Sequence, residues 1–207
     1  MSGLRERQKV DRERRILTAA IQKFRDEGYK RARIEDLAEE AEVSVGTVYN
    51  YYGTKGDILI AVVAMEVEEV LAEGQAIVDG PPPDLCDALN ALIFCYYDHS
   101  LHYLTKEMWR TAMALAIEAP GTPNGMRYAA LDQALSAQVA ALVARFQADG
   151  RVRADVDTRA IGQVLFNNLN QMFIEFVRNE AMTLDALRAA VAAQTAPIAR
   201  LLSGTRG

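Results

Sequence analysis

Apolar residues recur three and four positions apart along most of the chain, which is the spacing of one face of an α-helix. Leu184, Leu187, Val191 and Ile198 near the C-terminus follow this spacing most clearly. No segment is convincing as a strand, so the pattern predicts an all-α fold of about nine helices. They are expected near 12–27, in two short segments between 34 and 52, from about 55 towards 80, and near 85–103, 106–118, 126–148, 156–179 and 184–202.

The breaks between these helices contain turn-forming residues, with one exception. Gly80–Asp84 holds three consecutive prolines, and the loop at 119–125 holds two prolines and two glycines. In contrast, Thr54–Asp57 has the outline of a capping box that opens the fourth helix, and this helix leads out of the three-helix unit without any linker. We therefore expect a three-helix domain over residues 1–55 and a helical domain over 56–207, joined by that helix.

Two short helices that meet at a tight turn are predicted after the first helix. Leu37 and Ala41 belong to the apolar stripe of the first, and Ser44 is placed to cap the second. Val48 and Tyr52 face inward as core. The outer surface is then left with small and polar residues, namely Val45, Gly46, Thr47, Tyr49, Asn50 and Tyr51. A helix with such a face fits the DNA major groove, so this segment predicts a helix-turn-helix with double-stranded DNA as its partner.

The charge distribution agrees with a DNA partner although the chain as a whole carries −5. Residues 1–33 contain eleven Lys and Arg against five Asp and Glu, a net +6, which leaves −11 for the remainder. Binding to phosphates needs a local basic face and not a basic protein. Leu4–Val10 could follow a phosphate backbone or enter the minor groove, or it could be a solvated charged tail.

Val43–Lys55, with the sequence Val-Ser-Val-Gly-Thr-Val-Tyr-Asn-Tyr-Tyr-Gly-Thr-Lys, resembles the signature of the TetR family of bacterial transcription regulators. Ile16–Tyr29 is similar to the first helix of that family, with its closing Phe-x-x-x-Gly-Tyr. The resemblance is dense over residues 12–60 and thin after that. Three residues depart from the family pattern: Arg33 stands where Thr is common, Glu42 at the usual turn Gly, and Gly56 at a common Glu.

The resemblance implies a DNA-binding domain that reads a pseudo-palindromic operator, most simply as a repressor. Base reading would fall to Val45, Thr47 and Asn50, because Asn can form two hydrogen bonds to adenine and the methyl groups can meet a thymine methyl. The other expected DNA-binding residues cap or approach the helix or resemble family positions at phosphates: Arg33, Ser44, Gly46, Tyr49, Tyr51 and Lys55.

The last two helices are expected to form a homodimer interface. The helix near 184–202 has a narrow apolar seam of coiled-coil spacing, and the helix before it is apolar on more than one face. The resemblance implies a four-helix interface from two subunits, whereas the alternative is that the last helix only closes the core of the monomer. The expected interface residues are Ile161, Leu165, Met172, Phe176, Leu187, Val191 and Ile198.

The second domain is expected to bind a small apolar or aromatic effector that shifts the fourth helix and releases the DNA. Aromatic walls with a few amides and an imidazole suit such a ligand, although each of these side chains could equally be ordinary core. The candidate ligand-binding residues are Tyr96, His99, Tyr103, Trp109, Met113, Asn167, Asn170 and Phe173.

Cys95, His99 and His102 suggest an alternative effector. They lie four and three residues apart on one helix face and are metal-ligand types, but one helix rarely completes a metal site. A metal- or thiol-responsive regulator thus stays open beside the apolar-effector hypothesis, with no metal and no cofactor assigned. A third possibility is an architectural DNA-binding protein without an effector.

Several classes of protein are not supported by the sequence. It has no phosphate loop, no Gly-x-Ser-x-Gly and no His-Glu-x-x-His, so we expect no enzyme. No apolar run is long enough for a bilayer, and the charged N-terminus lacks a signal-peptide core. Only two cysteines are present. We therefore expect a cytoplasmic protein with no membrane partner.

Overall fold

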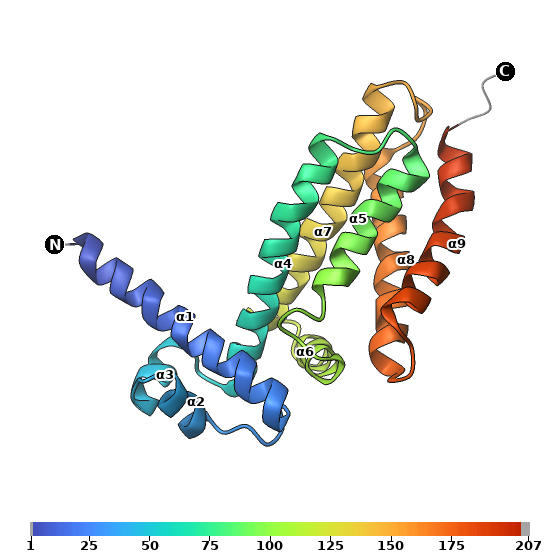
Figure 1. The fold of residues 1–207 in the computed structure, drawn as a ribbon. Coiled ribbons are helices and arrows are strands. Elements are labelled where there is room, and N and C mark those ends of the chain that lie inside the picture. Colours follow the sequence, from blue (N-terminus) through green and yellow to red (C-terminus); the bar gives the residue numbers. More distant parts are fainter. Residues whose placement is uncertain (1, 204–207) are drawn as a thin grey trace. The chain divides into compact units, whose positions relative to one another are not determined.

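The computed structural model describes residues 2–203, and within that range the chain forms nine α-helices and no strand (Figure 1). The predicted all-α fold is confirmed. The helices are α1 (Ser2–Glu27), α2 (Ile34–Glu40), α3 (Val45–Tyr51), α4 (Lys55–Asp79), α5 (Leu85–His99), α6 (Lys106–Glu118), α7 (Pro123–Ala148), α8 (Thr158–Arg178) and α9 (Leu184–Ser203). None of these nine helices combines the length and the apolar character that a membrane span requires.

Three helices differ from their predicted bounds at one end. α1 begins at Ser2 and not near residue 12, so Leu4–Val10 is helical and does not precede the first helix. α5 ends at His99, earlier than predicted. α7 begins at Pro123 inside the expected loop, because a proline fits the first helical position, where no N–H donor is needed.

The helices pack into two compact units. Unit 1 contains residues 2–65 and Tyr103–Tyr128, and unit 2 contains Glu66–His102 and residues 129–203. α4 and α7 therefore contribute to both units. The domain boundary expected at residue 55 coincides with the start of α4, whereas the packing divides the chain within α4 and places α6 in unit 1.

Unit 1 has a core in which α1 packs on α2 and α2 packs on α3. Ile16 and Phe24 of α1, Leu37 of α2 and Val48 of α3 are each at most 1% exposed. Their spacing along each helix is what the apolar pattern predicts, and burial of each such side chain contributes about 1.5–3 kcal/mol to folding. This core sets the position of α3.

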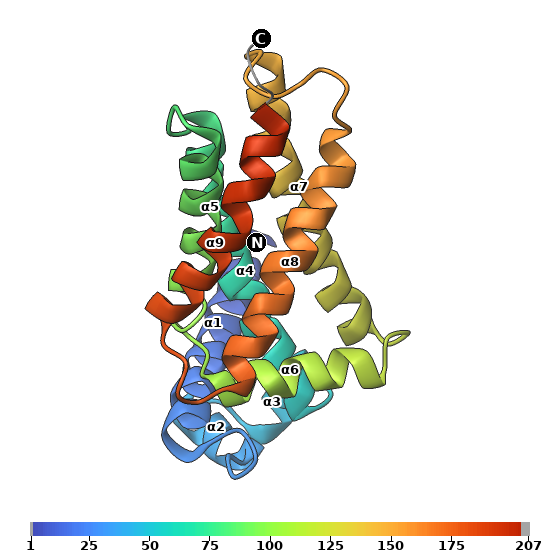
Figure 2. The same cartoon turned by 90° about the vertical axis from the view of Figure 1, so that its right-hand side faces the viewer.

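Unit 2 is a helical bundle in which α9 packs against both α5 and α8, as Figure 2 shows. The Tyr97 hydroxyl of α5 donates a hydrogen bond of 2.8 Å to the carbonyl of Leu169 in α8. α7 and α8 approach so closely that a Cβ added at Gly162 would lie 2.5 Å from the Cβ of Ala140. Glycine at position 162 is therefore a packing requirement of this pair.

Candidate nucleic-acid interface

The turn between α2 and α3 places Glu42 in the left-handed region, with φ 53°. The Glu42 N–H donates to the Glu39 carbonyl at 3.0 Å, and the Val43 N–H donates to the Ala38 carbonyl at 2.9 Å. A residue with a Cβ loses about 1–2 kcal/mol in this conformation. Glycine has no Cβ and adopts this conformation without strain, so Glu42 is less favourable than glycine in this turn.

This backbone conformation gives a direct stability prediction. We expect Glu42→Gly to have a free energy of unfolding about 1 kcal/mol above that of Glu42→Ala. Both substitutions remove the carboxylate and its 3.6 Å ion pair with Arg15, so their difference reports the backbone alone. Urea unfolding followed by circular dichroism measures it. Equal stability of the two variants would mean that position 42 does not keep a positive φ.

Ser44 caps α3 as predicted. Its Oγ accepts a hydrogen bond from the Thr47 N–H at 3.1 Å and lies 2.8 Å from the Thr47 hydroxyl. Along α3, Gly46, Tyr49 and Asn50 are exposed, and Val45 and Thr47 are half-buried. Val48 and Tyr52 are buried, at 0% and 7% exposure, which confirms their prediction as core. The outward face of α3 is therefore small and polar.

The end of α3 is bonded to α1 by two tyrosines. The Tyr51 hydroxyl donates to the backbone carbonyl of Lys9 at 3.1 Å, and the Tyr52 hydroxyl donates to Oε1 of Glu13 at 3.3 Å. Burial, followed by the Glu13 carboxylate, raises the pKa of Tyr52. Tyr51, expected at the DNA, is half-buried and has its hydroxyl engaged within unit 1. The two bonds connect the end of α3 to α1.

Lys55, predicted as a phosphate contact, has its ammonium group engaged within unit 1. Its Nζ donates to the backbone carbonyls of Tyr29 at 2.7 Å, Lys30 at 3.2 Å and Ala32 at 3.0 Å. The ammonium also lies 4.6 Å from the centre of the Tyr29 ring. Burial lowers the pKa of Lys55. Because an ammonium has three donors and all three are used, the side chain secures the start of α4 to the α1–α2 loop.

The start of α4 carries the predicted capping box. The Thr54 N–H donates to Oδ2 of Asp57 at 2.7 Å, and the Asp57 N–H donates to the Thr54 hydroxyl at 3.1 Å. Asn124 also donates to the Asp57 carboxylate.

Arg33, the other candidate DNA-binding residue outside α3, is exposed before α2 and lies 3.4 Å from Glu35. Arg33 is thus accessible to an anion, whereas the α4 start is held within unit 1.

The candidate effector residues of unit 2 differ in accessibility. The Tyr96 hydroxyl is buried and donates to Oε1 of Gln138 at 2.8 Å. The Phe173 ring stacks on Tyr97 with centroids 6.1 Å apart. Asn170 is half-buried, but Asn167 is exposed and accepts a hydrogen bond from Gln163 at 2.8 Å. Asn167 therefore lies on the outward side of α8, away from the buried face that carries Phe173.

In unit 1, the remaining effector candidates lie on α6 and just before it. Trp109 is 6% exposed, and Tyr103 and Met113 are half-buried. The structure thus places Tyr103, Trp109 and Met113 in unit 1 and the other five candidates in unit 2. Their joint role as a ligand site stays a prediction.

Cys95, His99 and His102 do not converge as metal ligands. Nδ1 of His99 lies 2.8 Å from Oε1 of Glu66, while His102 is exposed and stacks its ring on His99 at 5.2 Å. Within residues 2–203, no group of three or more His, Cys, Asp or Glu side chains could hold a metal ion. The geometry therefore gives no support to the metal-responsive alternative.

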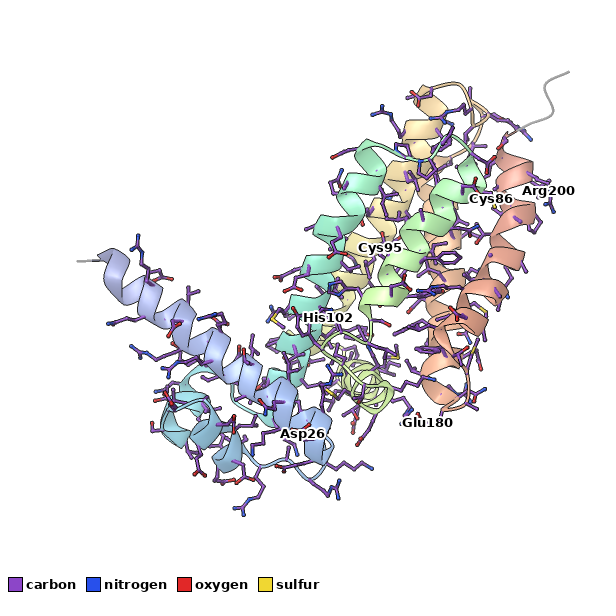
Figure 3. The ribbon with its side chains drawn as sticks, in the orientation of Figure 1. Asp26, Cys86, Cys95, His102, Glu180 and Arg200 are labelled. Atoms are coloured by element: carbon purple, nitrogen blue, oxygen red, sulfur yellow. The ribbon has the colours of Figure 1, made fainter. Side chains whose placement is uncertain are left out.

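The thiol-responsive alternative also lacks support. Burial, with Glu73 and Asp98 nearby, raises the pKa of Cys95 to about 11, so its thiol is protonated and a poor nucleophile. Burial also raises the pKa of Cys86. The two cysteines lie nine residues apart on α5 (Figure 3), a rise of about 13.5 Å along one helix, which is too far for a disulfide.

Two polar side chains are buried in unit 2, and neither was predicted as a site residue from the sequence. Glu66 of α4 is 2% exposed and bonds His99, and Gln138 of α7 is 8% exposed and donates to the Leu71 carbonyl at 2.8 Å. The signal at Glu66 is a charged residue within an apolar run, since Val63 and Val67 beside it are buried. Buried polar groups of this kind are candidates for orienting a ligand.

The residues expected at a dimer interface fall into two groups. Leu165, Phe176, Leu187 and Val191 are at most 1% exposed and pack inside unit 2, so they offer no surface to a second chain. The other three are half-buried: Ile161, Met172 and Ile198. Exposed residues instead line the outward sides of the two helices, with Val164 at 52% on α8 and Leu201 at 74% on α9. Other exposed residues on these sides are Asn167, Gln171, Glu175, Ala186, Ala189, Ala193, Pro197 and Arg200.

Comparison with known proteins agrees with this architecture. Residues 16–62, from within α1 to within α4, match the family model described as bacterial regulatory proteins, tetR family. Residues 16–62 thus carry the DNA-binding region of the TetR family. The repressor KstR from Rhodococcus jostii, an HTH-type transcriptional repressor, is 34% identical over 65 residues. That match covers 31% of this chain and 31% of KstR, so the chain spans less than a third of the length of that curated relative.

Solved structures extend the TetR likeness to the whole fold. A TetR-family transcriptional regulator from Mesorhizobium loti aligns with a TM-score of 0.73 and 18% identity, over 93% of this chain and 97% of that one. FadR from Bacillus subtilis, solved in complex with stearoyl-CoA, aligns with a TM-score of 0.66 and 18% identity, over 87% and 96%. At these identities, the likeness establishes the TetR fold and not the ligand.

Proposed function

We propose that the protein is a ligand-responsive transcription regulator of the TetR family that represses by binding a pseudo-palindromic operator. The observation that carries the proposal is the outward face of α3. Ser44 caps this helix, Tyr51 and Tyr52 bond its end to α1, and Asn50 is exposed on it. A rigid helix with an exposed amide and small neighbours can enter a major groove and discriminate between bases.

A homodimer is part of the proposal because one α3 reads only half of an operator. Two recognition helices about 34–36 Å apart would meet successive major grooves on one side of the duplex. The outward sides of α8 and α9 support this assembly, because they expose apolar Val164, Ala193 and Leu201, which a second copy would bury. Polar Gln171, Glu175 and Arg200 are exposed on the same sides. This surface replaces the buried members of the interface that the sequence suggested.

The effector is proposed to be a small molecule with a substantial apolar part. Half of the eight candidate residues are aromatic, and the FadR structure with the same fold holds stearoyl-CoA, so fatty-acyl thioesters are the first ligands to test. Binding to unit 2 would act through α4, which contributes residues to both units. An effector that binds more tightly when α4 has one position than when it has the other would shift the protein towards the first position. If that position fits the operator poorly, operator affinity falls by at most the ratio of the effector's two affinities.

The experiment that tests the proposal is selection of DNA from a random library by the purified protein. Enrichment of an inverted repeat would support a sequence-specific dimeric regulator and supply a probe for release by acyl-CoA or other ligands. Binding without sequence enrichment would contradict the proposal and favour an architectural protein that coats DNA. Size-exclusion chromatography with light scattering on the same sample reports the oligomeric state.

Asn50→Ala is expected to relax base preference at one position in each half-site. A bidentate contact from Asn to adenine is worth about 1–3 kcal/mol of discrimination, and truncation to Ala removes both hydrogen bonds. Repeating the selection with the variant measures the change. Asn168→Ala, the same substitution in α8 of unit 2, is the control and should select the parental site. An unchanged preference in Asn50→Ala would show that Asn50 is not a base-reading residue.

A further inference from the structure

α1 extends well beyond the family motif at its N-terminal end. The family match begins at residue 16, whereas the helix begins at Ser2, so about fourteen additional residues form a helical extension of roughly 21 Å. Residues 2–15 carry six Lys and Arg against three Asp and Glu, in a chain whose net charge is −5. Figure 1 shows this part of α1 projecting past α2 and α3 in unit 1.

The basic residues of the extension are not distributed evenly around the helix. Lys9 and Arg12 precede Ile16 by seven and four residues, so they share the helix face that farther along is buried against the rest of unit 1. Arg7 and Arg14 lie about 140–160° around the helix from Lys9. Lys9 and Arg12 thus continue the inward-facing stripe of α1 into a region where their side chains are exposed.

This face lies beside the end of the recognition helix. The Tyr51 hydroxyl donates to the Lys9 carbonyl, and the Tyr52 hydroxyl donates to the Glu13 carboxylate, so residues 9–13 of α1 adjoin the last turn of α3. Asn50 and Tyr49 are exposed on the same turn of α3. The turn of α1 that carries Lys9 and Arg12 is therefore continuous with the surface proposed to read bases.

The acidic residues of the extension do not pair with Lys9 or Arg12. The Asp11 carboxylate lies 3.1 Å from Arg14 and 3.5 Å from Arg15, and Glu13 accepts the bond from Tyr52. Within residues 2–203, neither Lys9 nor Arg12 forms an ion pair. Two cations beside the recognition helix are consequently available to an external anion.

We infer that the Lys9–Arg12 face of the α1 extension binds the sugar–phosphate backbone of the duplex that flanks the bases read by α3. The inference rests on the proposed function and adds a second contact surface to it. Phosphates recur about every 3.4 Å along each strand, so such a surface contributes affinity without sequence preference. Counterion release from these contacts makes the contribution strongly dependent on salt.

The test compares two charge-matched double variants on two duplexes. Lys9→Gln with Arg12→Gln removes the proposed contacts, and Arg7→Gln with Arg14→Gln removes the same charge from the opposite face. One duplex ends at the selected inverted repeat, and the other continues for one helical turn, about 10 bp, on each side. Affinity is measured by fluorescence anisotropy over a salt series, with a thermal melt of each variant to verify folding.

On the long duplex, we expect the Lys9/Arg12 variant to bind about tenfold or more weakly than the parent. Its log–log salt slope should be smaller by about 0.9 for each phosphate that the variant no longer neutralises. The Arg7/Arg14 variant should keep the parental slope there. On the short duplex, which lacks the flanking phosphates, the parent should have a smaller salt slope than it has on the long duplex. The Lys9/Arg12 substitutions should have little effect there.

Three outcomes would overturn the inference. The variants could have equal slopes on the long duplex, the Lys9/Arg12 variant could match the parent, or its weakening could be the same on both duplexes. Each of these leaves sequence-specific binding by the parent intact, so the proposed function would survive. Failure of the parent to bind the inverted repeat on either duplex would instead contradict the proposed function itself.

Discussion

Val164→Glu is expected to convert the protein from a dimer into a monomer and to abolish binding to the inverted repeat at concentrations where the parent is saturated. Val164 is 52% exposed on the outward side of α8, within the apolar surface that a second copy is proposed to cover. In a symmetric interface, the substitution would bury two unpaired carboxylates. A cost of about 3–5 kcal/mol for such a charge corresponds to more than about 100-fold in dimer affinity.

Ile117→Glu is the matched control for this substitution. Ile117 of α6 is also an exposed apolar residue, at 78%, and receives the same charge, but it lies in unit 1 and outside the α8–α9 surface. Light scattering should find a monomer for Val164→Glu and a dimer for Ile117→Glu, and circular dichroism should show that both variants are folded. A dimeric Val164→Glu would place the interface elsewhere on the molecule.

Lys55→Ala should destabilise unit 1 by about 3 kcal/mol. Hydrogen bonds to a charged donor contribute about 1.5–3 kcal/mol each, and water recovers part of the loss at the three carbonyls because Lys55 is only half-buried. For a protein of this size, the substitution lowers the melting temperature by about 6–12 °C. The affected carbonyls are those of Tyr29, Lys30 and Ala32. Operator binding should fail as unit 1 unfolds, while the salt dependence of binding below the melting temperature stays parental.

Lys30→Ala is the control for the loss of charge. Lys30 lies in the same loop and is exposed, so its truncation removes a positive charge without removing a donor to the three carbonyls. Its melting temperature should stay within about 2 °C of the parent, since surface substitutions usually change stability by less than about 0.5 kcal/mol. A Lys55→Ala variant with parental stability but a salt slope lower by about 1 would restore Lys55 as a phosphate contact.

The parts of the site predicted correctly from the sequence are those decided by neighbouring residues. The Ser44 cap and the Thr54–Asp57 capping box depend on groups three positions apart, whose meeting follows from helix geometry alone. The inward direction of Val48 and Tyr52 follows from helical periodicity, as does the all-α fold. The similarity of Val43–Lys55 to one family added the kind of partner.

The partners of Lys55 and Tyr51 could not be predicted in this way. Their hydrogen bonds reach carbonyls 23–26 and 42 residues away, so they depend on how α1, the loop after it and α4 pack together. A Lys or Tyr near DNA and one that braces the domain look alike in the sequence, because both sit at the edge of an apolar stripe. Only packing distinguishes the two roles.

The amino-acid pattern of α8 and α9 specifies which of their residues are apolar, but not which apolar face is covered within the chain. Helical periodicity places residues on faces, and two faces of α8 qualify. Tertiary packing buries Leu165, Phe176, Leu187 and Val191 against the rest of unit 2 and leaves Val164 and Leu201 exposed. Similarly, local composition made the start of the chain basic, while the tertiary contact between Tyr51 and Lys9 set that charge beside the recognition helix. Local hydrogen bonds and periodicity act over a few residues, whereas burial is decided by the neighbours that folding brings from elsewhere in the chain.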